Sequence, residues 1–119
     1  MKHRIDLYVP TKKPDGSPVP ESYLVGVREM MIRYFKGVTE YDVRGFWDTG
    51  EGTYVEDAIR IMYSLFDDAE DDMHTLPLAV AYVQDLAEDV RRQCEQECVL
   101  YVLDGVQSDL VFAPGDDED

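Results

Sequence analysis

The sequence is poor in basic residues and lacks any long apolar segment. It holds 11 Lys and Arg against 26 Asp and Glu, a formal charge of −15 at pH 7. Such a chain repels a phosphate backbone, so we expect no direct binding of DNA or RNA. No stretch approaches the ~18 apolar residues that a membrane helix needs. No secretory leader is recognisable either, so we expect a soluble cytoplasmic protein without a membrane partner.

Cysteine and histidine are also scarce: the chain has only Cys94, Cys98, His3 and His74. A structural zinc site needs four ligands at suitable spacing, which these residues do not supply. We expect free thiols in or beside the core, solvated histidines, and neither metal nor cofactor. No nucleophile stands beside a base, so the residues themselves indicate no catalytic centre.

What the chain does have is enough apolar surface to fold. At 45% hydrophobic residues over 119 positions it should form one domain, which we place at residues 1–112. Residues 113–119 are mostly acidic, and we expect a disordered tail there.

The periodicity of the apolar residues predicts the order strand, helix, strand, strand, helix, strand. The expected ranges are strands at 4–9, 38–47, 54–66 and 98–103, and helices at 22–36 and 75–94. Asp104-Gly105 is a two-residue hairpin turn, so 106–112 could return as a further strand. This order is typical of the ferredoxin-like α+β fold, an antiparallel sheet with two helices on one face.

Finer features follow from the same patterns. Ser22 is expected to cap the first helix and Gly37 to end it. One sheet face should carry Ile5, Leu7, Val43, Ile59 and Ile61 against the helices. The opposite face is left open, and because aromatic residues gather near it, we expect a homodimer or partner interface there.

Three short motifs resemble those of a family of small uncharacterised bacterial proteins. They are Pro14-Asp15-Gly16, Gly45-Phe46-Trp47 and Gln96-Glu97-Cys98-Val99-Leu100. The resemblance spans most of residues 5–103 and implies the same ferredoxin-like fold, but no activity. Cys98 stands where the family has serine, and the acidic residues at 67–75 and in the tail depart from its pattern.

The charge pattern favours a small non-catalytic regulatory protein that docks on a basic protein surface. Sixteen of the 26 acids lie between Asp67 and Asp119. A strip of carboxylates could imitate nucleic acid and inhibit a nucleic-acid-binding enzyme, as a phage or mobile-element protein would. The predicted partner-binding residues are Asp67, Asp68, Glu70, Asp71, Asp72, Asp85, Glu88 and Asp89.

The alternative is a small-molecule-binding protein or an enzyme with a pocket near the sheet. Its predicted lining combines aromatic rings with cations, the mixture that orients small ligands. These residues are Tyr8, Arg44, Trp47 and Arg60.

Overall fold

A computed structural model describes residues 2–68, 75–105 and 107–112, with Val111 the one described side chain of the last range. Its elements are β1 (Lys2–Pro10), α1 (Glu21–Phe35), β2 (Thr39–Asp48), β3 (Tyr54–Asp67), α2 (Leu76–Gln93), β4 (Cys98–Leu103) and β5 (Gln107–Phe112). This order is the ferredoxin-like fold with one extra strand, as the sequence predicts. The expected tail, 113–119, lies outside the described residues.

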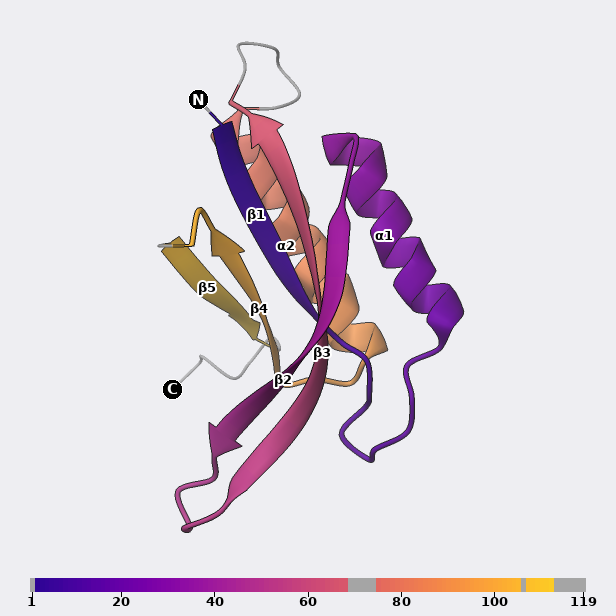
Figure 1. Cartoon of the computed structure of the whole chain (residues 1–119), viewed down its shortest axis with the longest axis vertical. Coiled ribbons are helices and arrows are strands. Elements are labelled where there is room, and N and C mark those ends of the chain that lie inside the picture. The colour runs from indigo at the N-terminus through magenta and orange to yellow at the C-terminus, as the bar shows by residue number, and fades with distance from the viewer. Residues whose placement is uncertain (1, 69–74, 106, 113–119) are drawn as a thin grey trace.

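The sheet has the order β2-β3-β1-β4-β5, and every neighbouring pair is antiparallel. Both helices pack on one face of it, and the β2–β3 hairpin extends well beyond them (Figure 1). Asp104 and Gly105 both have positive φ, 55° and 71°, as the tight turn between β4 and β5 requires. Neither helix in the described part of the chain has the length and apolar content needed to cross a membrane.

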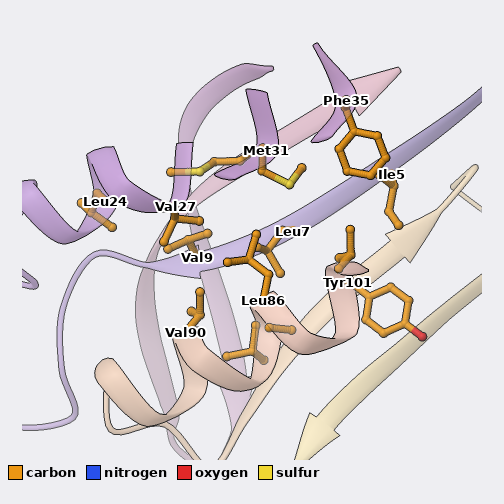
Figure 2. Close-up of a cluster of buried hydrophobic side chains, with 14 of the residues drawn as sticks. Ile5, Leu7, Val9, Leu24, Val27, Met31, Phe35, Leu86, Val90 and Tyr101 are labelled. Atoms are coloured by element: carbon orange, nitrogen blue, oxygen red, sulfur yellow. The ribbon is translucent and has the colours of Figure 1, made fainter. Parts of the chain in front are cut away.

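The core lies between the two helices and the central strands. Ile5, Leu7 and Val9, at alternate positions of β1, are completely buried under them. The helices contribute residues at three- and four-residue spacing, which places them on one helical face (Figure 2). These residues are Leu24, Val27, Met31 and Phe35 from α1, and Ala79, Val83, Leu86, Ala87 and Val90 from α2.

The ends of α1 differ from the prediction. Pro20 is the N-cap residue and Ser22 lies inside the helix, so the helix begins earlier than expected. Proline fits this place because it has no N–H group to leave unpaired. At the other end Lys36, not Gly37, adopts the left-handed conformation, with φ 72°.

The predicted face of β3 is also wrong. Ile5 lies opposite Ser64 and Leu7 opposite Met62, so the even-numbered residues of β3 face the helices. Val43, Ile59 and Ile61 therefore lie on the opposite, open face. The strand carries apolar residues on both faces, so its alternation could not decide which face is covered.

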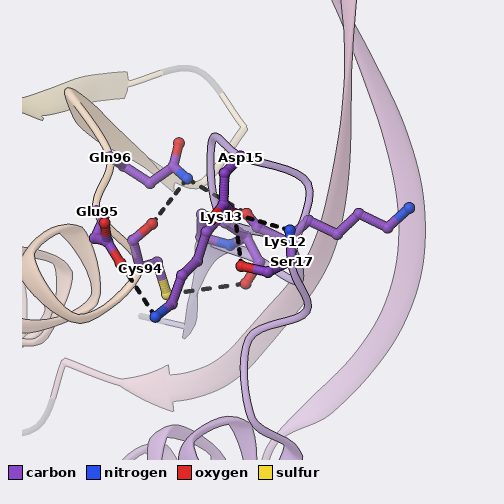
Figure 3. Close-up of polar contacts among 8 residues, drawn as sticks. Lys12, Lys13, Asp15, Ser17, Cys94, Glu95 and Gln96 are labelled. Carbon is purple, nitrogen blue, oxygen red and sulfur yellow. Dashed lines mark hydrogen bonds and ion pairs between the residues drawn. The ribbon is translucent and has the colours of Figure 1, made fainter.

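The loop after β1 is fastened to the turn that follows α2 (Figure 3). The Gln96 side-chain amide donates to the carbonyl oxygens of Lys12 and Cys94, at 3.4 and 3.1 Å. Cys94 is buried and Cys98 half-buried, and both are free thiols, as expected. Burial raises the pKa of Cys94 to about 11, so this thiol is neutral at pH 7 and serves packing.

Candidate functional site

The open face of the sheet carries a broad depression of about 770 Å³. The even-numbered residues of β1 point into it because their odd-numbered neighbours are buried beneath the helices. Polar residues therefore stand on the open face of β1, whereas Ile5, Leu7 and Val9 occupy its buried face. The lining includes Arg4, Asp6 and Tyr8 from β1, Tyr41 from β2, Leu65 from β3, and Leu100 and Val102 from β4.

Arg4 and Asp6 form a two-pronged ion pair in this depression. Arg4 Nε lies 2.8 Å from Asp6 Oδ1, and Nη2 lies 2.9 Å from Oδ2. The Asp6 side chain is only 11% exposed, whereas that of Arg4 is 42% exposed. A nearly buried carboxylate is tolerated because the guanidinium fork pairs both of its oxygens.

Two tyrosines hold the guanidinium from the side of β2 and β3. Arg4 Cζ lies 3.7 Å from the centre of the Tyr63 ring, a cation–π contact. Its Nη2 lies 3.4 Å from the Tyr41 hydroxyl, and the two rings meet edge to face at 6.2 Å. The Arg4 side chain is thus fixed by groups from three strands.

The charges of this cluster follow from those contacts. Hydrogen bonding to Asp6 raises the pKa of Arg4, so the guanidinium stays charged at any pH of interest. Burial, and then the nearby Asp6 charge, raise the pKa of Tyr8. Tyr8 is therefore a neutral hydroxyl that can donate a hydrogen bond.

His3 and Asp104 border the depression. His3 Nδ1 lies 2.7 Å from Asp104 Oδ2, and the His3 ring packs on Phe66 with centroids 5.2 Å apart. The expectation of a solvated His3 is wrong: it is 7% exposed. His74 lies outside the described residues.

A second, smaller depression of about 610 Å³ lies between α1 and α2. Its tyrosines already have partners: the Tyr23 hydroxyl donates to Asp89 at 2.7 Å, and that of Tyr82 to the Met30 carbonyl at 2.9 Å. These bonds join the two helices, so we assign the groove to helix packing.

The four residues predicted to line a pocket do not come together. Of these four residues, only Tyr8 lines the sheet-face depression. Arg60 lies on the covered face, where it binds Asp42 at 2.7 Å and Glu21 at 3.0 Å. Arg44 and Trp47 lie on the extended hairpin, with the Trp47 side chain 52% exposed.

The predicted acidic surface is divided among several roles. Asp68 accepts the Leu76 N–H at 3.1 Å and so helps to cap α2, and the exposed Asp67 precedes it. Asp85 and Asp89 line the groove between the helices. Glu88 binds Arg91 at 2.7 Å, which lowers the Glu88 pKa.

Glu70, Asp71 and Asp72 lie outside the described residues. In the described ranges no three His, Cys, Asp or Glu side chains converge where they could hold a metal ion.

The sequence patterns do not single out Arg4, Asp6, Tyr41 and Tyr63. A signal was present in β1: Arg4, Asp6 and Tyr8 are polar or amphipathic residues two apart, alternating with Ile5 and Leu7. Their convergence with Tyr41 and Tyr63 depends on strand order and register, which are set by tertiary pairing.

No known family model matches the chain, and no curated protein matches it. Among solved structures, it is similar to a phage SAM lyase in complex with S-methyl-5′-thioadenosine, with a TM-score of 0.71 and 13% sequence identity. It is also similar to the phage SAM lyase in the apo state, with a TM-score of 0.68 and 15% identity. Each match covers 94% of this chain and 90% of the other.

These similarities correct the function expected from charge. The acidic composition predicted a non-catalytic protein that docks on a basic surface as a nucleic-acid mimic. That prediction is contradicted, because the fold that extends over 94% of this chain is found in an enzyme that takes a small nucleoside ligand. The alternative, a small-molecule-binding protein or enzyme, is the one the findings favour.

Proposed function

We propose that this chain binds S-adenosylmethionine (SAM) on the open face of its sheet and cleaves it to S-methyl-5′-thioadenosine (MTA). The observation that carries this proposal is the match along nearly the whole chain to a phage SAM lyase with MTA bound. At 13% identity the match gives the fold. The assignment to the sheet face rests on the side chains of this chain.

The lining of the sheet-face depression suits the chemistry of SAM. The ligand carries a sulfonium and an ammonium cation, a carboxylate, and a flat adenine ring whose two faces are apolar. Tyr8 and Tyr41 offer aromatic rings to a cation. Leu100 and Val102 provide an apolar surface for the base.

The net charge of −15 supports a cationic ligand. SAM bears one net positive charge at neutral pH, and an acidic protein raises the local concentration of such a ligand. The acidity that suggested a basic protein partner thus has a simpler role in the proposed function.

The proposed reaction needs no general acid. MTA is what remains of SAM when the bond from sulfur to Cγ of the methionine part breaks. Sulfur takes the electron pair and leaves as a neutral thioether, so nothing has to protonate it. The four-carbon fragment becomes a lactone if its own carboxylate attacks Cγ. It becomes an alkene if solvent water takes a Cβ proton and the electrons of that C–H bond form the Cβ–Cγ double bond.

Calorimetric titration with SAM and with MTA tests binding, with S-adenosylhomocysteine as the control that lacks the sulfonium charge. We expect SAM to bind more tightly than this control. Incubation with SAM, followed by chromatography for MTA, tests cleavage, and vinyl protons in the NMR spectrum distinguish the alkene from the lactone. Absence of binding by both SAM and MTA contradicts the proposal.

We place this activity in the cytoplasm. Both cysteines are free thiols, as is usual in a reducing compartment.

A further inference from the structure

Resting on the function proposed above, we propose that Arg4 binds the carboxylate of the methionine part of SAM and so distinguishes SAM from MTA. Arg4 lines the sheet-face depression, and 42% of its side chain is exposed there. MTA has no carboxylate. The contact therefore belongs to the substrate and is lost in the nucleoside product.

The guanidinium has donors to spare for a ligand. Of its five N–H groups, Nε and Nη2 are directed to Asp6 and Tyr41. No hydrogen bond joins Nη1 to any side chain or backbone group that the structure describes. The N–H groups of Nη1 are thus available to a ligand carboxylate while the ion pair between Arg4 and Asp6 remains intact.

The side chain is already held in place. Asp6 fixes the plane of the guanidinium through two hydrogen bonds, and Tyr63 stacks against it at 3.7 Å. An arginine fixed in this way loses little conformational entropy when it binds a ligand. Asp6 is therefore a positioning residue for Arg4.

The surrounding charge makes Arg4 the suitable cation for this task. The acidic side chains that line the depression are Asp6 and Asp104, and its arginine and lysine are Arg4 and Lys2. Lys2 is exposed at the start of β1. A carboxylate entering a protein of charge −15 needs a fixed positive group to offset repulsion, and Arg4 supplies it.

The test compares Arg4→Gln with Arg44→Gln, using SAM and MTA as probes. Arg44 is a matched control: it also pairs with a carboxylate, Glu56 at 3.7 Å, and lies near an aromatic ring, Phe46 at 5.7 Å, but outside the depression. We expect Arg4→Gln to weaken SAM binding about tenfold, as loss of a charge-assisted hydrogen bond implies. The affinity of Arg4→Gln for MTA should differ from that of the wild type by less than about twofold. Arg44→Gln should leave the SAM-to-MTA affinity ratio as in the wild type.

Arg4→Gln leaves the Asp6 carboxylate without its partner, which could unfold the protein. The double variant Arg4→Gln/Asp6→Asn removes both charges and should fold, with the same loss of SAM binding and retained MTA binding. Decarboxylated SAM, which lacks the carboxylate, tests the same contact from the ligand. The wild type should bind decarboxylated SAM no more tightly than Arg4→Gln binds it.

Three outcomes overturn the inference. Equal weakening of SAM and MTA by Arg4→Gln means that Arg4 supports the nucleoside site as a whole. Unchanged SAM binding in both Arg4 variants means that Arg4 does not contact the carboxylate, although the proposed function still holds. A wild type that binds neither ligand ends the proposed function and this inference with it.

Discussion

Asp104 holds the start of β1 through three hydrogen bonds. Its Oδ2 lies 2.7 Å from His3 Nδ1, its Oδ1 accepts the Arg4 N–H at 2.7 Å, and its own N–H donates to the Arg4 carbonyl, also at 2.7 Å. These bonds join two segments that are about a hundred residues apart in the sequence. They also fix the backbone from which the Arg4 side chain extends.

We predict that Asp104→Asn lowers the free energy of unfolding by about 1 kcal/mol at pH 7, the usual value of a hydrogen bond to a charged group at a partly exposed position. Asparagine tolerates the positive φ of 55° at this residue, so the change tests the charge and not the turn. Urea unfolding gives the value. Glu97→Gln, an exposed position that loses the same charge, is the control.

The stabilities of the wild type and of Asp104→Asn should depend differently on pH. The hydrogen bond from His3 lowers the pKa of Asp104 in the folded state below its unfolded value. Its contribution is therefore present above the unfolded pKa, near ~3.9, and is lost as the pH falls through the lower folded pKa. The difference between wild type and Asp104→Asn should shrink below about pH 4. A difference that stays constant into acid means that the charge does not matter.

At the scale of elements, the Tyr23–Asp89 hydrogen bond ties α1 to α2. Tyr23→Phe should cost about 1 kcal/mol of stability, whereas Tyr54→Phe, at a side chain 69% exposed, should cost almost nothing. Burial and the Asp89 charge raise the pKa of Tyr23 above its unfolded value near 10. The stability it provides is thus complete below about pH 10 and falls as the pH rises toward the folded pKa. Urea unfolding at neutral and alkaline pH measures both effects.

The helices could be predicted more fully than the sheet. In α2 the apolar residues at three- and four-residue spacing are all on the buried face, because this spacing marks one face of the helix against a charged one. In β3, Ile59 and Ile61 alternate with Met62 and Ser64, and the apolar pattern does not reveal which set meets the helices. Register settles that face, and register depends on contacts far apart in the chain.

The site depends on the same information. Asp6 lies opposite Tyr63, and Tyr41 shares a row with Ile61 and Tyr8, only because β3 lies between β1 and β2. The predicted fold implies which strands are neighbours, but the register between them is not encoded in the local pattern, so the cluster around Arg4 could not be assembled from the sequence.

One substitution on each face of β3 tests which face of the strand packs against the helices. Met62 is completely buried beneath the helices, whereas Ile59 is half-buried on the open face. Met62→Ala should therefore cost about 3 kcal/mol, as a truncation in the core does, and Ile59→Ala about 1 kcal/mol. Thermal and urea unfolding provide the comparison. The reverse order of costs would restore the face predicted from alternation.

At the scale of the whole molecule, the net charge of −15 opposes folding through self-repulsion. Salt shortens the Debye length from roughly 30 Å at 0.01 M to roughly 3 Å at 1 M. We expect the melting temperature to rise by about 4 °C or more over this range, equivalent to about 1 kcal/mol for a domain of this size. Calorimetry at several salt concentrations measures it, and a fall with salt means that local ion pairs outweigh the repulsion.

The exposed β2–β3 hairpin offers a surface through which two copies of this chain could associate. Trp47 and Val55, 52% and 51% exposed, continue the open face of the sheet, while Phe46 and Tyr54 cover the other side of the same hairpin. Exposed apolar surface of this kind favours association, but like charge keeps the copies apart until salt screens it. We therefore expect a homodimer whose association strengthens with salt, as measured by sedimentation velocity.

Two substitutions test which surface the dimer uses. Trp47→Ser should weaken the dimer, and Leu78→Ser, at an apolar side chain 49% exposed on α2, should not. If the wild type remains a monomer at high salt, the open face serves only the ligand. A dimer insensitive to Trp47→Ser uses a different surface.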